Sequence, residues 1–408
     1  MKLILARRLL TCANDKARIE KDMGVLIDGE TIADVLPLCA CQSLMERADV
    51  EVIDAQDAVV MPGMIDAHLH LCFDSSPNPI VALETENAYQ TLMRMTAAAQ
   101  RELFSGVTTI RDAGAKGNSV FALRDEIRKG NLLGPDIVAA GPCITITGGH
   151  CHFLGLEVDT PDEVRRAVRQ LLKDGADYIK VMISGGNMTP GSSPLIDHYD
   201  AETLSIITRE AHMHGKKVAA HVHTVKGIQD AITAGIDTLE HCSYKSADAP
   251  DGVDYRPELA KQLAERGIQV CPAMGKAFIL SAEEGAPLPD KVAIWAAFQR
   301  SRFETTEAMY RAGVTIIAGT DAGCKNSYFD ELALTLGIFE EKIHMQIEDV
   351  ILGATARAAK AIDRAGLVGS IEKGKQADIL FVSGDPTEDL SALRRVCRVL
   401  KRGRTVRQ

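Results

Sequence analysis

Long apolar runs are missing from this chain of 408 residues. No stretch approaches the roughly 20 residues that a membrane-spanning helix requires. A basic surplus is missing too, because 56 acidic side chains outnumber 46 basic ones and give a net charge of −10. Surfaces that bind nucleic acid are strongly basic. We therefore expect no nucleic acid and no membrane among the partners of this protein.

Paired cysteines and a secretion signal are also missing. None of the ten cysteines stands in a CxxC motif, and a chain of this length does not depend on a disulfide framework. We interpret them as free, buried thiols. Arg7 and Arg8 interrupt the apolar start MKLILARRLLTC, and no convincing cleavage site follows. We expect a first β-strand at this position and a cytoplasmic protein.

A recurring unit of helix, glycine and short apolar strand fills residues 61–359. Helical patterns at 162–175, 200–215, 225–235 and 257–267 all end in glycine, which is a common helix stop. This alternation predicts an α/β fold with a parallel sheet. Eight strands are expected, which is the number in a closed (β/α)8 barrel of the TIM type. They cover residues 64–70, 107–114, 136–142, 177–183, 217–223, 238–242, 268–273 and 315–322.

A doubly wound open sheet is the alternative fold. It is disfavoured because no glycine-rich phosphate-binding fingerprint follows the first strand of the repeat region. Both chain ends differ from the repeats, since residues 1–60 and 360–408 show short strands broken by tight turns. We expect these two ends to form one small β-sandwich domain beside a barrel domain at residues 61–359.

Polar residues stand out where they interrupt or end the apolar strands. His68 and His70 are two apart on one expected strand, so both side chains should point to the same face. Chemistry in such barrels occurs at the carboxyl ends of the strands, and converging imidazoles suit a zinc-like ion. The sequence therefore predicts a metal site. The further candidates at strand ends are His221, His223, His241 and Asp321.

Lys180 lies in the middle of the apolar strand YIKVMI. A buried ammonium group is costly unless it is paired or chemically altered. Three interpretations are open: a lysine that extends its charge to solvent, a Schiff-base lysine, or a lysine carboxylated by carbon dioxide that bridges two metal ions. The histidines on the neighbouring strands favour carboxylation.

Six motifs, taken in order, resemble those of the amidohydrolase superfamily over essentially the whole chain. They are PGMIDAHLH, the lysine of YIKVMI, AAHVH, TLEHC, GTDAG and the tail GSIEKGKQADILF. The resemblance implies two divalent metal ions, for which imidazole-rich ligation favours zinc, and a carboxylated Lys180 as the bridge between them. In this scheme, the more buried ion is held by His68, His70 and Asp321.

The resemblance also implies ligands for the second ion, namely His221 and His241. His221 is preferred to His223 because similar sequences place this ligand 20 residues before the next histidine. His223 would then be a neighbour that faces the substrate.

The imidazolonepropionase-like branch, with its Xaa-Pro dipeptidases (prolidase-like) and related carboxypeptidases, gives the nearest resemblance within the superfamily. The motifs are GVTTIRDAG, GPCITITGGHCHF and AHVHT followed by AGIDTLEHC. In that branch the histidine of the GGH loop faces the active site, and here it is His150. It would stabilise an oxyanion or bind a substrate carboxylate, whereas the alternative is a structural loop histidine. Tyr199 is a further pocket candidate, and Cys151 and His152 are given no role.

These features predict a binuclear metal-dependent amidohydrolase that cleaves an amide bond by metal-activated hydroxide, with Asp321 carrying the proton. We expect a small-molecule or dipeptide substrate, namely a dipeptide (Xaa-Pro or similar) or an N-acyl amino acid. A non-peptide amide, cyclic amide, carbamate, urea-type compound or lactone is the alternative. A Schiff-base lyase that uses Lys180 is the alternative of another class. A homo-oligomer is expected, although the low aromatic content of 4% identifies no interface.

Overall fold

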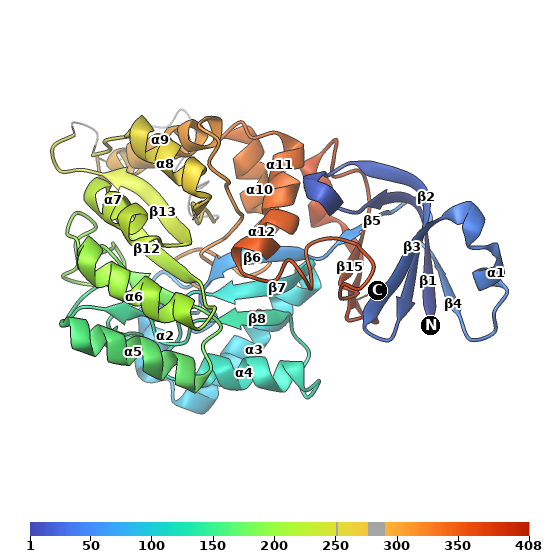
Figure 1. The fold of residues 1–408 in the computed structure, drawn as a ribbon, viewed down its shortest axis with the longest axis horizontal. Helices are drawn as coiled ribbons and strands as arrows, with labels where there is room; N and C mark the ends of the chain where they lie inside the picture. Colours follow the sequence, from blue (N-terminus) through green and yellow to red (C-terminus); the bar gives the residue numbers. More distant parts are fainter. Residues whose placement is uncertain (250–251, 276–289, 408) are drawn as a thin grey trace.

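The computed structural model describes residues 1–249, 252–275 and 290–407, and it leaves out the side chains of residues 290–296. The fold is α/β, as predicted, and the two chain ends lie together at one end of the molecule (Figure 1). Parallel strands with helices around them make up the rest. None of the helices in the described ranges combines the length and the apolar character needed to cross a membrane.

Strands from both chain ends form one mixed sheet of eight strands, in the order β17-β16-β15-β5-β1-β2-β3 with β4 paired to β1. The antiparallel pairing of β5 with β15 joins the two ends, because Pro62 lies opposite Ile379. The hydrogen bonds connect these strands into a single sheet that branches at β1, because β4 and β5 pair with different parts of that strand. The strands are β1 (Lys2–Leu10), β2 (Ile19–Asp28), β3 (Thr31–Pro37), β4 (Glu51–Asp54), β5 (Val59–Pro62), β15 (Ile379–Val382), β16 (Val396–Lys401) and β17 (Arg404–Arg407).

The remaining strands pair only in parallel and form a three-stranded and a six-stranded sheet. Seven of the eight strands predicted for the barrel are present among them. The first sheet holds β6 (Met64–Leu69), β7 (Val107–Asp112) and β8 (Asp136–Ala139). The second holds β9 (Ile144–Thr145), β10 (Leu156–Glu157), β11 (Ile179–Met182), β12 (Val218–Thr224), β13 (Thr238–Lys245) and β14 (Gln269–Cys271).

The eighth predicted strand, residues 315–322, is not a regular strand. It forms two isolated parallel bridges, one from Ile316 to Val270 of β14 and one from Ala322 to Leu69 of β6. The left-handed φ of 58° at Asp321 interrupts the extended backbone between them. The described sheets therefore do not form one continuous closed barrel, although this segment connects β14 to β6.

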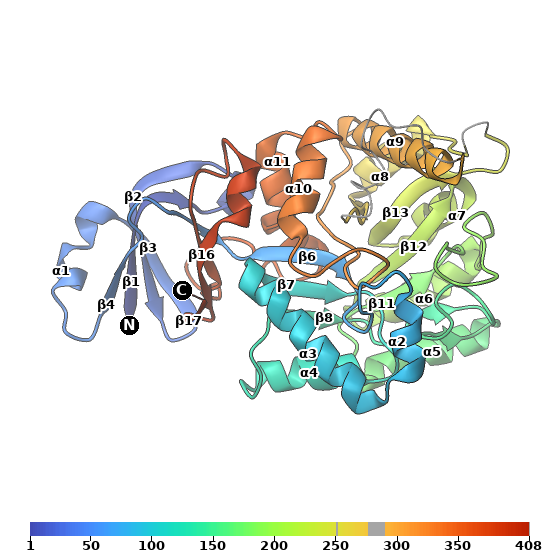
Figure 2. The same cartoon turned by 180° about the vertical axis from the view of Figure 1, so that it is seen from behind.

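Helices lie on the outside of the parallel strands in both views (Figure 1 and Figure 2). The predicted glycine stops are confirmed at Gly175 and Gly235, whose φ values of 101° and 74° end α5 and α7 in the left-handed conformation. The helices are α1 (Gln42–Met45), α2 (Pro79–Thr85), α3 (Ala88–Ser105), α4 (Ser119–Arg128), α5 (Pro161–Asp174), α6 (Ala201–Met213), α7 (Val225–Ala234), α8 (Pro257–Arg266), α9 (Asp290–Arg311), α10 (Leu332–Glu341), α11 (Ile347–Gly353) and α12 (Ala356–Ala361).

Lys401, the last residue of β16, connects the mixed sheet to the parallel strands by ion pairs and a hydrogen bond. Its buried ammonium group lies 2.8 Å from Asp136 of β8 and 2.7 Å from Asp378, and it donates to the carbonyl of Thr108 at 2.9 Å. Two carboxylates thus share one buried cation at the junction.

Replacing Lys401 with methionine should lower the free energy of unfolding by about 3–5 kcal/mol, because Asp378 stays buried and loses its cation, whereas Asp136 keeps Arg402. Urea denaturation followed by circular dichroism measures the change. Lys373→Met is the matched control, since Lys373 is exposed and should change stability by less than about 0.5 kcal/mol. Equal stability of the two variants would contradict the structural role of Lys401.

Candidate metal centre

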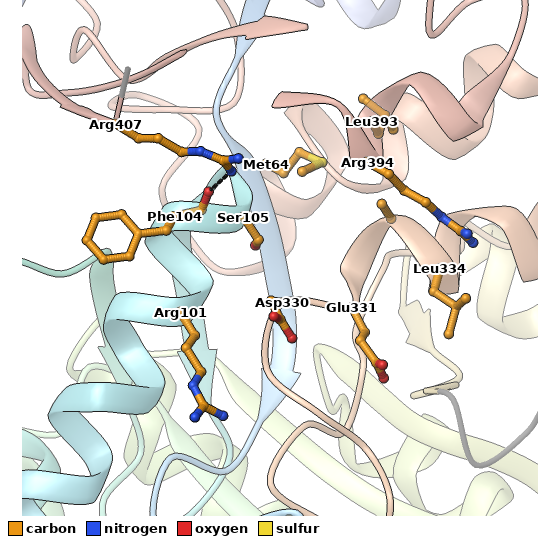
Figure 3. Close-up of a pocket in the computed structure, with 11 residues that line it drawn as sticks. Met64, Arg101, Phe104, Ser105, Asp330, Glu331, Leu334, Leu393, Arg394 and Arg407 are labelled. Atoms are coloured by element: carbon orange, nitrogen blue, oxygen red, sulfur yellow. Dashed lines mark hydrogen bonds between the residues drawn. The ribbon is translucent and has the colours of Figure 1, made fainter. Parts of the chain in front are cut away.

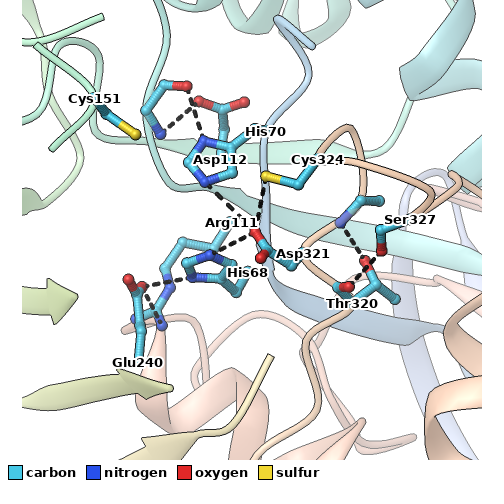
Figure 4. A network of polar contacts seen from close by, with 12 residues as sticks. His68, His70, Arg111, Asp112, Cys151, Glu240, Thr320, Asp321, Cys324 and Ser327 are labelled. Atoms are coloured by element: carbon cyan, nitrogen blue, oxygen red, sulfur yellow. Dashed lines mark hydrogen bonds and ion pairs between the residues drawn. The ribbon is translucent and has the colours of Figure 1, made fainter. Parts of the chain in front are cut away.

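The carboxyl end of β6 brings His68 and His70 together with Asp321. Both histidines are buried, and their ring centroids are 5.3 Å apart. One carboxylate oxygen of Asp321 lies 3.2 Å from Nε2 of His68 and 3.7 Å from Nε2 of His70 (Figure 4). The HxH pattern therefore delivers two imidazoles to one acidic group, as the period of two along a strand requires.

The surroundings of these two imidazoles indicate which nitrogen is free to bind a metal. Nδ1 of His70 lies 3.2 Å from the carbonyl of Gly114, which can only accept a hydrogen bond, so Nδ1 carries the proton. Nδ1 of His68 faces the carboxylate of Glu240 at 2.9 Å, which favours the same tautomer. Both rings thus turn Nε2 toward Asp321. Burial lowers the pKa of His68, and it lowers that of His70 to about 4, so both are neutral as metal ligation requires.

The ends of β12 and β13 supply a second group of imidazoles. The ring of His221 lies 4.6 Å from that of His241 and 4.5 Å from that of His223, and His241 lies 5.4 Å from His68. Nε2 of His221 faces the carbonyl of Gly185 at 3.2 Å, which places the proton there and leaves Nδ1 free. Burial lowers the pKa of all three β12 and β13 histidines well below the usual range.

His223 makes a different contact from its neighbour. Its Nδ1 lies 2.5 Å from the hydroxyl of Ser243 on β13, and its ring stacks on His241 at 5.1 Å. His223 therefore lies inside the histidine group, as predicted, with one ring nitrogen engaged by the next strand.

Lys180 reaches the same group from β11. The side chain is 1% exposed, and its ammonium nitrogen contacts the carboxylate of Glu240. Burial, reinforced by the charge of Arg111, lowers the pKa of Lys180 to about 7. A substantial fraction of the amine is therefore neutral near pH 7, and the neutral amine is the form that combines with carbon dioxide.

The backbone at these strand ends is unusual. His241, Cys242 and Tyr244 of β13 have φ values of 64°, 46° and 49°, and Asp321 has 58°. Left-handed non-glycine residues cost about 1–3 kcal/mol each when the conformation is strained, and they gather at functional sites. His241 and Asp321 therefore have backbone conformations that selection for stability alone would not favour.

Two of the predicted substrate residues have different surroundings. The ring of His150 lies 4.5 Å from His221, and its Nδ1 is 3.0 Å from the hydroxyl of Thr189, so this loop histidine belongs to the group. Burial lowers the pKa of His150 to about 3. Tyr199 instead donates its hydroxyl to the carbonyl of Val158 at 2.7 Å, and no contact among the described residues connects it to the histidines.

The donor set fits divalent cations. Ligand atoms of His68, His241 and Asp321 lie within 4.8 Å of one another, as do those of His70, Asp321 and Cys324. In the described part of the chain, Nε2 of His68 and the amine of Lys180 are buried and face carboxylates, but neither forms a hydrogen bond of regular geometry. A buried polar atom without a regular hydrogen bond is costly, and a bound cation and a lysine carboxylate would satisfy these two atoms.

A separate hollow of about 490 Å³ lies between α3, α10 and the C-terminal strands (Figure 3). Arg101, Arg394, Arg407, Asp330 and Glu331 contribute charged groups to its lining. None of the predicted site residues lines it, so this hollow is distinct from the histidine group.

Comparison with known proteins decides the family. The profile of the amidohydrolase family matches residues 59–406, which is most of the chain. This protein belongs to the amidohydrolase family. The family predicted from the sequence motifs is confirmed, and the protein is a hydrolase that acts on amide or peptide bonds.

Similar proteins give this amidohydrolase its context. It is 30% identical over 362 residues to an ochratoxinase from Aspergillus niger, which covers 81% of this chain and 72% of the relative. The solved structure of a Xaa-Pro dipeptidase with bound methionine is 29% identical, with a TM-score of 0.85 and full coverage of both chains. A prolidase complexed with N-methylphosphonate-L-proline is 27% identical, with a TM-score of 0.83 and coverage of 100% of this chain and 99% of the other.

Glu240 and Arg111 lie beside the histidine group, but the sequence motifs gave no role to either residue. Glu240 is fully buried and connects His68 to Lys180, and Nη2 of Arg111 lies 3.5 Å from it. Arg111 also donates to the carbonyl of Ala67 at 2.7 Å. A signal was present, because both are charged residues inside apolar strands, but the sequence does not show that β7 and β13 bring them together.

Glu240→Gln should weaken metal binding by about 10- to 100-fold, because groups that orient a ligating histidine matter to that degree. Competition titration of the purified protein with a zinc indicator measures the affinity without any substrate. Glu102→Gln is the matched control, since Glu102 is another fully buried carboxyl group outside this network. If both variants bind zinc like the unaltered protein, Glu240 does not orient His68.

Two further side chains have surroundings that the sequence does not show. His198 is only partly exposed, and its Nδ1 is buried. Burial lowers its pKa. The thiol of Cys324 donates to Asp321 at 3.2 Å, a contact created by the irregular turn after residues 315–322.

Proposed function

We propose that this amidohydrolase is binuclear, with two divalent ions, zinc being favoured, and a carboxylated Lys180 between them. The proposed substrate is a dipeptide of the Xaa-Pro or a similar type, or an N-acyl amino acid. The observation that carries the proposal is the convergence of ligand groups from separate strands on one buried place. The proposed ligands are His68, His70, Lys180, His221, His241 and Asp321.

The similar proteins support an amino acid on the leaving side of the bond. The Xaa-Pro dipeptidase holds methionine in its active site, and the prolidase binds a phosphonate derivative of L-proline. Both compounds carry a free carboxylate on the carbon atom that is bonded to the nitrogen. We carry this substrate class over to the present chain as part of the proposal.

Bound divalent ions would lower the pKa of a water molecule to near neutrality and would polarise the scissile carbonyl. The chain's own groups do the rest. Asp321 accepts the proton from the attacking water on its carboxylate and passes it to the leaving amine nitrogen. His150, which lies beside His221, donates a hydrogen bond to the oxyanion that develops on the carbonyl oxygen.

We also propose that the parallel strands make up a barrel at residues 61–359 and that residues 1–60 and 360–408 form the accompanying small domain. The bridges from residues 315–322 to β14 and β6 support this arrangement, as does the likeness to the amidohydrolase structures. The site then lies at the carboxyl ends of the strands, where this architecture places its chemistry.

Metal analysis combined with a substrate panel tests the proposed function. The panel contains dipeptides ending in proline, arginine or lysine, N-acyl amino acids, cyclic amides, carbamates, ureas and lactones. We expect two metal ions per chain and turnover of linear amides that is lost on chelation and returns with zinc. Turnover confined to the cyclic or non-peptide compounds would move the substrate to the alternative class. Borohydride trapping of a carbonyl compound on Lys180 would overturn the proposal in favour of a lyase.

A further inference from the structure

A lysine lies beside the histidine group, and the described residues provide no acidic partner for it. Lys245 is the last residue of β13, and it pairs with Thr224 of β12, the residue that follows His223. Ser243, two positions earlier on β13, contacts Nδ1 of His223. Burial lowers the pKa of His223 most, and the positive charge of Lys245 is close enough to lower it further. Lys245 therefore lies at the His223 side of the centre, away from Asp321's contacts with β6.

The described residues around the ammonium group of Lys245 are apolar or positive. Its ammonium nitrogen lies 4.0 Å from the ring centroid of Phe298 on α9. Burial, together with the nearby guanidinium of Arg302, lowers the pKa of Lys245 to about 8, so the side chain is still mostly charged at pH 7. Arg302 is itself buried and donates to the carbonyl of Pro272. Across the described ranges, no carboxylate forms an ion pair with Lys245.

Among the described residues, a ring and another cation are the groups found beside this half-buried ammonium, and such a position is unfavourable unless something negative binds there. The neighbouring histidines are neutral and offer no countercharge. A carboxylate would gain a charge-assisted hydrogen bond in this position, and it would gain more than in water because the site is partly desolvated. The local charge therefore selects an anionic group.

We propose that Lys245 binds the free carboxylate of the amino acid that leaves in the reaction. The inference rests on the proposed function and narrows its substrate class. The preferred substrate is an amide whose leaving group is an amino acid with an ionised carboxylate. The same compound with a neutral terminal amide is a poor substrate. The scissile carbonyl lies toward Asp321, and the carboxylate lies toward the end of β13.

Matched substrates test this directly. Each dipeptide and N-acyl amino acid in the panel is compared with its C-terminal amide in the zinc-loaded protein. Lys245→Met should lower kcat/KM for the free acids by about 10- to 100-fold, the range expected for one charge-assisted hydrogen bond, and should leave kcat/KM for the amides unchanged. Lys245→Arg should retain most of the preference for the acids. Lys226→Met, at an exposed lysine of α7, is the control and should change neither class.

Calorimetry separates failure of the inference from failure of the proposed function. Proline, methionine and lysine are titrated as free amino acids and as amides into the zinc-loaded protein. If no panel compound is hydrolysed but the free amino acids bind and Lys245→Met removes that binding, the reaction is wrong and the carboxylate site stands. The inference is overturned if Lys245→Met affects acids and amides equally, if it changes nothing, or if the unaltered protein binds no free acid.

Discussion

Asp321→Asn should yield a folded protein whose kcat is lower by about 10³- to 10⁴-fold, the size of a lost general base. The asparagine keeps the shape of the side chain but cannot take the proton of the attacking water. Nε2 of His68 and of His70 both face one oxygen of Asp321, so the substitution also weakens a shared ligand. Steady-state kinetics and metal content by mass spectrometry measure the two effects separately.

The control for this variant is Asp349→Asn on α11. Asp349 accepts hydrogen bonds from Tyr310 and Arg357 and is not a member of the histidine group. We expect full turnover from that variant. Turnover near that of the unaltered protein in Asp321→Asn, with both metals bound, would exclude the proton-transfer role of Asp321.

Lys180→Ala should lower activity by roughly a thousandfold or more, because a bridging carboxylate stabilises a pair of cations by several kcal/mol. Metal content should fall in the same variant. A small acid such as propionate fits the volume left by the lysine side chain and supplies a carboxylate, so millimolar propionate should restore part of the activity and of the metal content. Titration of the variant with propionate, followed by both readouts, measures the rescue.

Lys217→Ala is the control, because Lys217 is partly buried but lies outside the histidine group and donates to the backbone carbonyls of Lys360 and Ala361. It should keep its activity and show no response to propionate. A Lys180→Ala protein that retains two metals and full turnover without added acid would refute carboxylation. The Schiff-base alternative would be favoured by two results together. Propionate would fail to restore activity to Lys180→Ala, and borohydride would trap a carbonyl compound on Lys180 of the unaltered protein.

The strand-end histidines could be predicted because their signal is local. His68 and His70 are two apart in an apolar strand, and this spacing alone fixes a common face. The burial of Lys180 could be predicted for the same reason, since its neighbours in the strand are all apolar. The helix stops at Gly175 and Gly235 depend on one residue each, and these were also correct.

Contacts between distant strands could not be predicted in this way. Glu240 meets His68 and Lys180 only because β6, β11 and β13 end close together, and no spacing within one strand contains that information. The extended run at residues 315–322 was expected to be a strand, but the left-handed Asp321 breaks it at the position where function places a ligand. The partly buried position of His198 could not be predicted either, because tertiary packing sets the path of a loop.

The pairing of β5 with β15 has a consequence for the order in which the protein is made. Val59 and its neighbours are synthesised more than 300 residues before Val382, the residue opposite Val59. Until the ribosome has released this late segment, one side of β5 has unpaired backbone groups, and an unpaired strand edge invites contact with other chains. The nascent chain must therefore carry an incomplete sheet for as long as the residues between β5 and β15 are being translated.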